Sequence, residues 1–253
     1  MKEFNVDRLD VRIYDTRLNM GVNAAGIVAR KIVELLTQKP FINIIFAAAP
    51  SQNEFLAALV EKASVDWTRV NAFHMDEYIG LPENATQRFG SFLKEKIFSH
   101  LPFHSVGYIN GNAAPEAECM RYAKLLEQFP PDIVCMGIGE NAHIAFNDPH
   151  VADFNDPFMV KKVELDRACR QQQVNDGCFA RLSDVPDHAI TLTVPALMLG
   201  KYIYCMVPGK NKAKAVHETL YGDIGERCPA SVLRKHPNAV LFLDEDSADQ
   251  LNF

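Results

Sequence analysis

The sequence lacks long apolar runs and most of the short motifs by which common protein classes are recognised. No apolar stretch among its 253 residues approaches the ~20 residues that a helix needs to cross a bilayer. The N-terminus, Met1 to Asn5, is polar and does not resemble a signal peptide. A Gly-x-Ser-x-Gly elbow and a Walker loop are both missing. These absences argue against a membrane protein, a serine hydrolase of the elbow type and a P-loop nucleotidase.

Cysteine is present without the spacing that binds metals. The chain has no Cys-x-x-Cys pair, and its six cysteines are scattered: Cys119, Cys135, Cys169, Cys178, Cys205 and Cys228. Several stand in apolar runs, so we expect most of them to be buried thiols in a reducing compartment. Cysteines and histidines form no grouping typical of zinc, and we expect no metal. These features predict a cytoplasmic protein.

Charge and composition are those of an ordinary globular protein. The net charge of −6 argues against binding to nucleic acid or to an anionic membrane, although it allows a local basic pocket for a small anion. With 48% hydrophobic and 23% charged residues, the chain can bury a substantial core. Linkers, repeats and low-complexity segments are missing, so we expect one domain over residues 1–253.

Short apolar runs alternate with amphipathic stretches along the chain. The runs predict strands at 41–46, 69–74, 106–109, 132–137, 202–207 and 239–243. The stretches between them predict helices at 21–38, 54–63, 87–99, 114–128 and 211–220. Residues 150–187 predict loops with a strand near 160–163. In residues 188–194 apolar and polar side chains alternate, and residues 195–199 predict a short helix. This order predicts an α/β fold, a three-layer α/β/α doubly wound and mainly parallel sheet of Rossmann-like type.

A polar stretch follows the run Ile133–Met136. Gly137 and Gly139 allow a sharp turn and a close approach of backbone to a ligand. Glu140, Asn141, His143 and Asp148 come next, where ligands sit in open α/β sheets. A histidine there can transfer a proton near neutral pH, and neighbouring amide or carboxylate groups can fix its tautomer. The alternative, a glycine turn with solvated polar residues, stays open.

A pair of carboxylates, Asp76 and Glu77, follows another predicted strand. A carboxylate at that sheet edge can abstract a proton from a carbon next to a carbonyl or imine. We expect Asp76 to be ionised at neutral pH, as a carboxyl group of ordinary pKa is. An acidic loop or a helix start on the surface is the alternative interpretation.

Two further segments are candidates for binding phosphate. Ser51 stands between a strand and a helix, where backbone N–H groups and the helix dipole attract anions. Ser51 and Glu54 also fit a capping box, which would explain both without a ligand. Lys210, Lys212 and Lys214 stand at a predicted helix start, where cations are unfavourable. This favours a ligand-binding role for at least one of them, with a solvated charged face as the alternative.

Taken together, these segments resemble the glucosamine-6-phosphate deaminase/isomerase family, which is related to 6-phosphogluconolactonases and ribose-5-phosphate isomerases. The resemblance covers most of the chain and is most specific at 73–82 and 137–149. Shorter segments at 91–92, 185–186, 189–191, 229–231 and 236–237 support it. The run Ile144 to Asn147 resembles the deaminases more than the lactonases.

The resemblance implies a role for each candidate residue. Asp76 matches the base that moves a proton between C2 and C1 of the open sugar, and His143 matches the group that opens the ring. Asn141 and Asp148 would orient His143. Lys212 matches a phosphate-binding lysine, and Ser51 lies in the phosphate loop. Glu77 and Gly139 complete the expected substrate-binding set.

The sequence departs from the family at four places. Asn141 replaces an aspartate and cannot stabilise an imidazolium by charge, so we expect ring opening to be slower or to work at a different pH. Asp148 replaces a glutamate and is one methylene shorter, and a shift near 1 Å can cost on the order of 100-fold in rate. Gly177 stands where the family has a phosphate-binding arginine. Residues 47–51 replace a Gly/Thr-rich loop. The departures at 177 and 47–51 bear on which sugar phosphate is the substrate.

The resemblance therefore implies an aminosugar-6-phosphate deaminase/isomerase that needs no metal or organic cofactor. Its expected partner is a phosphorylated amino sugar of glucosamine or galactosamine type. A catalytically weakened sugar-phosphate sensor, a 6-phosphogluconolactonase-like hydrolase and a plain isomerase remain alternatives. The sequence leaves open the identity of the sugar and the choice between monomer and homo-oligomer.

Overall fold

A mostly parallel sheet of eight strands forms the centre of the protein, whose computed structural model describes residues 1–251. Its strand order is β1-β2-β11-β10-β7-β3-β4-β6, and every pair is parallel except β1 with β2. The strands are β1 (Lys2–Val6), β2 (Leu9–Tyr14), β3 (Ile42–Phe46), β4 (Val70–His74), β6 (Ser105–Gly107), β7 (Ile133–Met136), β10 (Tyr202–Val207) and β11 (Ala239–Asp244). The six strands predicted from apolar runs are all present in this sheet.

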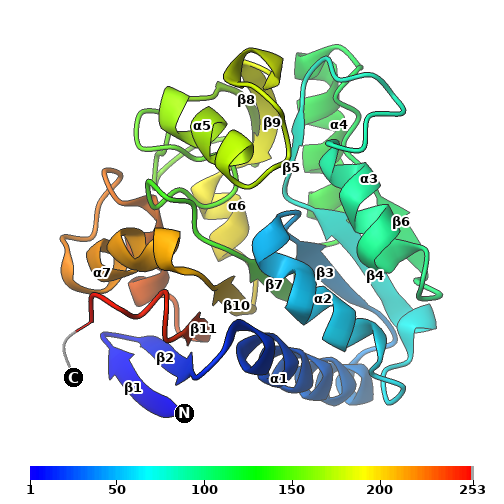
Figure 1. Ribbon diagram of the computed structural model, residues 1–253. Helices are drawn as coiled ribbons and strands as arrows, with labels where there is room; N and C mark the ends of the chain where they lie inside the picture. Colours follow the sequence, from blue (N-terminus) through cyan, green and yellow to red (C-terminus); the bar gives the residue numbers. More distant parts are fainter. Residues whose placement is uncertain (252–253) are drawn as a thin grey trace.

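Helices cover both faces of the large sheet (Figure 1), as the sequence predicted. The α-helices are α1 (Arg17–Gln38), α2 (Asn53–Val60), α3 (Phe89–Leu93), α4 (Pro115–Gln128), α5 (Arg167–Asn175), α6 (Val194–Met198) and α7 (Ala213–Tyr221). Short 3₁₀ turns stand at Pro50–Gln52, Trp67–Arg69, Leu182–Asp184, Lys210–Lys212 and Pro229–Lys235. In β3, Ile44 and Phe46 pack on the side of α1 and α2, and Ile45 packs on the side of α4 and α6. Burial of both faces explains why these strands read as unbroken apolar runs.

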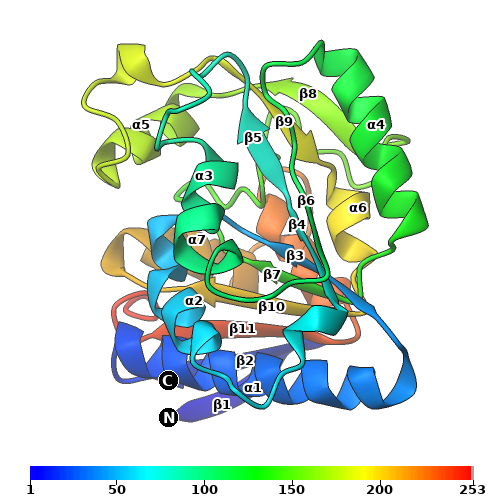
Figure 2. The same cartoon turned by 90° about the vertical axis from the view of Figure 1, so that its right-hand side faces the viewer.

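A second, smaller sheet stands above the large one (Figure 2). It has three antiparallel strands in the order β5-β9-β8: β5 (Asp76–Tyr78), β9 (His188–Leu192) and β8 (Val160–Glu164). Only Met75 separates β4 from β5, and its carbonyl accepts a hydrogen bond from Leu192 N at 2.8 Å. The sequence predicted β8 and the alternation of β9, but not their pairing with the segment after β4. That segment is a strand in a sheet, and neither the loop nor the helix start of the alternative interpretation.

Three other segments differ from the expectation. The hairpin β1–β2 was not predicted. Residues 87–99 form a short α3 followed by a π-helix over Lys94–Phe98, not one continuous helix. The helix α5 occupies part of the region expected to be loops, and it begins where Asp166 accepts a hydrogen bond from Cys169 N at 2.6 Å. Its sequence is rich in glutamine and arginine, so an apolar period is hard to see.

The cysteines are mostly buried thiols, as we expected. All six cysteines are free thiols, and five of them are buried. Among residues 1–251, we find no helix that combines the length and the apolar character needed to traverse a bilayer.

The packing of α1 on α2 requires a glycine at position 21. A Cβ atom there would lie 2.7 Å from Glu54 Cβ and 2.8 Å from Phe55 N. We expect Gly21→Ala to lower the free energy of unfolding by about 1–3 kcal/mol because the helices must move apart. Gly26→Ala on the same helix is the matched control, since its nearest neighbour is the end of the Arg30 side chain at 3.6 Å. There we expect a gain of about 0.5–1 kcal/mol from helix propensity. Urea denaturation of both variants checks this, and equal effects would contradict the packing argument.

Candidate active site

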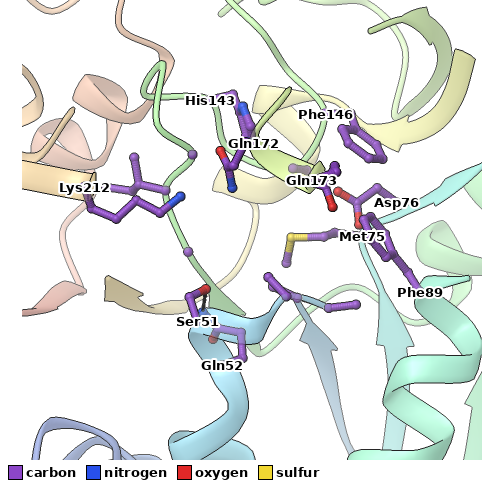
Figure 3. A pocket seen from close by; sticks show the side chains of 17 residues that line it. Ser51, Gln52, Met75, Asp76, Phe89, His143, Phe146, Gln172, Gln173 and Lys212 are labelled. Atoms are coloured by element: carbon purple, nitrogen blue, oxygen red, sulfur yellow. Dashed lines mark hydrogen bonds between the residues drawn. The ribbon is translucent and has the colours of Figure 1, made fainter. Parts of the chain in front are cut away.

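A cleft of about 500 Å³ opens at the carboxyl ends of the central strands. The residues that line it follow different strands: Ser51 after β3, Asp76 after β4, His143 after β7 and Lys212 after β10. Figure 3 shows Lys212 on one side of the cleft and Asp76 on the other. The structure therefore brings together four residues that the sequence placed at the ends of four strands.

The loop after β7 turns sharply to bring His143 to the cleft. Ala142 and Ala145 have φ angles of 64° and 46°, a backbone conformation that non-glycine residues seldom adopt. Gly139 N donates a hydrogen bond to the His143 carbonyl at 2.9 Å. A Cβ atom on Gly139 would lie 2.2 Å from the imidazole Cε1, so only glycine leaves room for the ring. Gly139 lines the cleft, and its first role is to make space for His143.

Asn141 and Asp148 both contact the same nitrogen of His143. The imidazole Nδ1 lies 2.7 Å from Asn141 Oδ1 and 3.0 Å from Asp148 Oδ1. Both of these atoms are acceptors, so in the neutral ring Nδ1 carries the hydrogen and Nε2 has the lone pair. The Asn141 amide also donates to Asp148 Oδ1 at 3.0 Å and to Asp166 Oδ2 at 3.1 Å. The imidazole is thus fixed in one tautomer with Nε2 available as a base.

Asp148 supplies the negative charge that Asn141 lacks. Its side chain is fully buried, which by itself would raise its pKa. Hydrogen bonds from His143, Asn141 and the Asp166 backbone outweigh burial and lower the pKa of Asp148 to about 2. The shorter side chain of Asp148 still lies 3.0 Å from the imidazole Nδ1, so the loss of one methylene leaves this contact in place. The departures at 141 and 148 therefore leave the histidine with a charged neighbour.

The surroundings of Asp76 disfavour the ionised form of its carboxyl group. It is 6% exposed, and burial together with the neighbouring charge of Glu77 raises its pKa well above the ordinary range. The expectation of an ordinary carboxylate was therefore wrong, because burial depends on tertiary packing. Once its proton is removed, a carboxylate of raised pKa is a stronger base than an exposed aspartate.

His74 holds the backbone of Asp76 in place through a hydrogen bond. Ile109 N donates to His74 Nε2 at 2.9 Å, so the ring hydrogen is on Nδ1, which donates to the Asp76 carbonyl at 2.9 Å. Burial lowers the pKa of His74 to about 4, which keeps this imidazole neutral. The β5–β9 pairing, with Asp76 opposite Thr191, holds the same residue from the other side.

Glu77, which we expected to contact the substrate, is held in this structure by backbone N–H groups. Its carboxylate accepts hydrogen bonds from Tyr78 N and Phe89 N at 3.0 Å and from Gly90 N at 2.9 Å. Two of these donors belong to the first turn of α3. Successive residues of a strand point to opposite faces, and Glu77 is not among the residues that line the cleft. It caps α3 and adds negative charge beside Asp76.

Lys212 is the buried cation of the cleft. It is 4% exposed, and burial lowers its pKa against the opposing effects of Asp176 and Glu140. Within residues 1–251 its ammonium group forms no ion pair, whereas Lys210 and Lys214 are exposed and lie near Asp249 and Glu218. A buried cation without a partner is a suitable site for an anionic group of a ligand.

Ser51 lies in the same cleft and does not form the alternative capping box. The residue that precedes α2 is Gln52, and it makes no capping hydrogen bond with its side chain. Glu54 instead pairs with Arg17 at 2.7 Å. The Ser51 hydroxyl accepts a hydrogen bond from Gln52 Nε2 at 3.1 Å and faces the cleft with it.

The arginines near Gly177 do not replace the missing one. Arg170 pairs with Asp187 at 2.6 Å, Arg181 pairs with Asp184 at the surface, and Arg167 is exposed. Two glutamines of α5, Gln172 and Gln173, line the cleft instead. Sequence reasoning missed both. The only signal was three consecutive glutamines after the capping residue Asp166, and that signal required recognising the helix.

Two clusters have ligand atoms within 4.8 Å of one another, which is close enough for a metal ion. One is His143, Asp148 and Cys169, and the other is Asp148, His150 and Asp166. Burial and the nearby carboxylates raise the pKa of Cys169, which opposes the thiolate that a metal needs. The atoms of His143 and Asp148 already bond each other. Hydrogen bonding within the described chain thus accounts for these contacts.

Comparisons with known proteins agree on one family. Residues 16–242 match the family described as glucosamine-6-phosphate isomerases/6-phosphogluconolactonase. A glucosamine-6-phosphate deaminase of Bacillus cereus (strain B4264) is 39% identical over 191 residues, 75% of this chain and 71% of that protein. One of Bacillus thuringiensis (strain Al Hakam) is 40% identical over the same shares.

Solved structures give the same result for the fold. The structure of a monomeric glucosamine-6-phosphate deaminase is 28% identical, with a TM-score of 0.85 over 94% of this chain and 98% of that chain. A 6-phosphogluconolactonase from Thermotoga maritima is 20% identical, with a TM-score of 0.76 over 92% and 98%. The latter likeness concerns the fold alone.

The raised pKa of Asp76 gives a prediction about stability. Between the pKa values of the unfolded and folded states, the folded protein binds more protons, so its stability falls as pH rises, by up to about 1.4 kcal/mol per pH unit. Asn cannot ionise. We therefore expect Asp76→Asn to stabilise the fold at neutral pH, by a margin that grows from about pH 4 upward.

Urea denaturation of both proteins over a pH series measures that margin. Asp249→Asn is the control, because it is the same substitution at an exposed aspartate. A constant difference between Asp76→Asn and the original protein at all pH values would show that Asp76 is not destabilised by its charge.

Proposed function

The chain belongs to the glucosamine-6-phosphate isomerase/6-phosphogluconolactonase family, and we propose from this that it is an aminosugar-6-phosphate deaminase. It would convert a hexosamine 6-phosphate of glucosamine or galactosamine type into a ketose 6-phosphate and ammonia. The observation that carries the proposal is one cleft with an oriented imidazole, a buried carboxyl group of raised pKa and a buried unpaired lysine. The named relatives with about 39–40% identity are deaminases.

In the first step His143 would open the sugar ring. Its Nε2 can take the proton from the hydroxyl on C1 and give a proton to the ring oxygen, which breaks the C1–O5 bond. The imidazole carries positive charge between these transfers, and the ionised Asp148 at 3.0 Å stabilises that charge. Asn141 keeps the ring orientation by its own hydrogen bond at 2.7 Å.

In the second step Asp76 would move a proton from C2 to C1. The aldehyde formed on ring opening acidifies the C2 proton, so a carboxylate can remove it. A substrate ammonium group near Asp76 would offset the cost of ionisation and lower the pKa that burial raises. Asp76 returns the proton to C1 while a proton passes from the nitrogen to the C1 oxygen, which leaves a hydroxyl on C1 and an imine at C2. Water then adds to C2, and the nitrogen departs as ammonia.

Neither step requires a metal or an organic cofactor, since the substrate carbonyl itself activates the C2 proton. The sugar phosphate would lie with its phosphate at Lys212 and Ser51 and its reacting carbons at Asp76, because these lie on opposite sides of the cleft (Figure 3). The free and mostly buried thiols fit a cytoplasmic location.

Ammonia release from glucosamine 6-phosphate, galactosamine 6-phosphate and the unphosphorylated sugars tests both the reaction and the phosphate site. We expect turnover of a phosphorylated hexosamine, and we expect Lys212→Ala to lower kcat/KM for it by about 10²-fold or more, since a buried charged contact is lost. Activity on the free sugar should change little. Lys210→Ala and Lys214→Ala are matched controls, because both lysines are exposed.

Two results would contradict the proposal. If no hexosamine 6-phosphate releases ammonia while binding persists, the protein is not a deaminase, and the sensor, lactonase and plain isomerase alternatives remain. If Lys212→Ala affects the free and the phosphorylated sugar equally, Lys212 does not bind phosphate.

A further inference from the structure

Gln173 is a buried amide that has no hydrogen-bond partner in the described chain. It is 8% exposed and lines the cleft from α5. Its two neighbours of the same type both make hydrogen bonds. Gln172 accepts from Glu140 N at 2.8 Å and donates to Asp176 at 3.2 Å, and Gln171 donates to Asn175 at 3.1 Å. Gln172 and Gln173 both line the cleft, and of the three glutamines only the side-chain amide of Gln173 has no partner within residues 1–251.

The side chain of Gln173 is mostly buried, and its amide is accessible from the cleft and forms no hydrogen bond within residues 1–251. Most buried side-chain polar groups in proteins are hydrogen-bonded, and those that are not deserve a specific explanation. An amide has two donors and an acceptor, so Gln173 brings a full set of unused hydrogen bonds to the cleft. Since the surrounding protein satisfies none of them, a bound ligand is the natural partner.

The position of Gln173 limits which part of a ligand it can reach. Figure 3 shows it on the Asp76 side of the cleft, across from Lys212. Phosphate at Lys212 therefore leaves Gln173 near the reacting end of the sugar. In the proposed mechanism His143 contacts the hydroxyl on C1 and Asp76 contacts C2. The next polar group at that end of the sugar is the hydroxyl on C3.

The residue type suits this neighbourhood. A lysine or arginine at position 173 would pair with Asp76 and lower the pKa that burial raises, and a carboxylate would raise it further. A neutral amide contacts a hydroxyl and leaves the charge state of the base unchanged. We propose that Gln173 is a specificity-determining residue that hydrogen-bonds the C3 hydroxyl of the sugar phosphate. This inference rests on the proposed deaminase function.

The choice of variant follows from the second cavity beside the cleft. Gln173 also lines this cavity of about 650 Å³, together with Ala48, Phe89 and Gly177. Gln173→Ala would remove a side chain that lines both the cleft and this cavity. The effect of losing a hydrogen bond could then not be separated from the effect of a changed cleft shape. Gln173→Met keeps an unbranched side chain of similar length and removes the amide. Gln171→Met is the matched control, because it is the same change on the exposed side of α5.

The experiment compares glucosamine 6-phosphate with its 3-deoxy and 4-deoxy analogues, by kcat/KM and by affinity measured directly by isothermal titration calorimetry. Removing the C3 hydroxyl or the Gln173 amide should each cost about tenfold or more, since each leaves a buried partner unpaired. With the 3-deoxy analogue, Gln173→Met should bind as well as the original protein, and this also shows that the variant is folded. With the 4-deoxy analogue, Gln173→Met should still bind about tenfold or more weakly than the original protein. Gln171→Met should bind all three sugar phosphates as the original protein does.

The assignment is overturned if Gln173→Met weakens binding of the 3-deoxy analogue by the same factor as it weakens binding of glucosamine 6-phosphate. The Gln173 amide and the C3 hydroxyl would then act independently. So would an unchanged affinity of Gln173→Met for glucosamine 6-phosphate. The proposed function fails separately: it falls if the original protein releases no ammonia, whereas the affinities still test the contact of Gln173 with the sugar.

Discussion

The burial of Asp76 beside Glu77 is the constraint on which the cleft depends. Burying two adjacent carboxyl groups opposes folding, because ionised groups lose hydration. The chain offsets the cost by giving Glu77 three backbone N–H donors at the start of α3, while the Asp76 carboxylate lines the cleft and makes no hydrogen bond within residues 1–251. A functional group whose charge is disfavoured in the empty protein is a frequent feature of active sites.

The pKa values of the two aspartates of the site, Asp76 and Asp148, are shifted in opposite directions. Hydrogen bonds from His143 and Asn141 lower the pKa of Asp148, whereas burial and Glu77 raise the pKa of Asp76. Pairs of titratable groups with separated pKa values often mark distinct roles in acid and base chemistry. Here Asp148 suits the stabilisation of a positive imidazole, and Asp76 suits proton transfer at carbon.

Much of the fold could be predicted from the sequence, because strands buried on both faces appear as short apolar runs. The same reasoning placed Ser51, Asp76, His143 and Lys212 at one sheet edge, since each follows a parallel strand. The small sheet could not be predicted in this way. Its strands β5, β8 and β9 are far apart in sequence, and β5 has only three residues.

Other properties of the site depend on contacts that a sequence does not display. The pKa of Asp76 follows from burial, and the capping role of Glu77 follows from the position of α3. The departures at 141 and 148 suggested a weakened histidine, whereas the structure shows how amide and carboxylate share one nitrogen. The glutamines of α5 were missed because the helix itself was not recognised.

The central claim is that Asp76 transfers the C2 proton, and hydrogen isotope incorporation during turnover tests it most directly. The protein and Asp76→Asn would each be incubated in heavy water with the hexosamine 6-phosphate that is turned over, and C1 of the ketose product analysed for deuterium. The account predicts deuterium at C1 with the original protein and a rate lower by about 10²–10⁴-fold with Asp76→Asn, whose amide is too weak a base. Sugar phosphate binding should be nearly unchanged. Incorporation by Asp76→Asn at the original rate would contradict the claim.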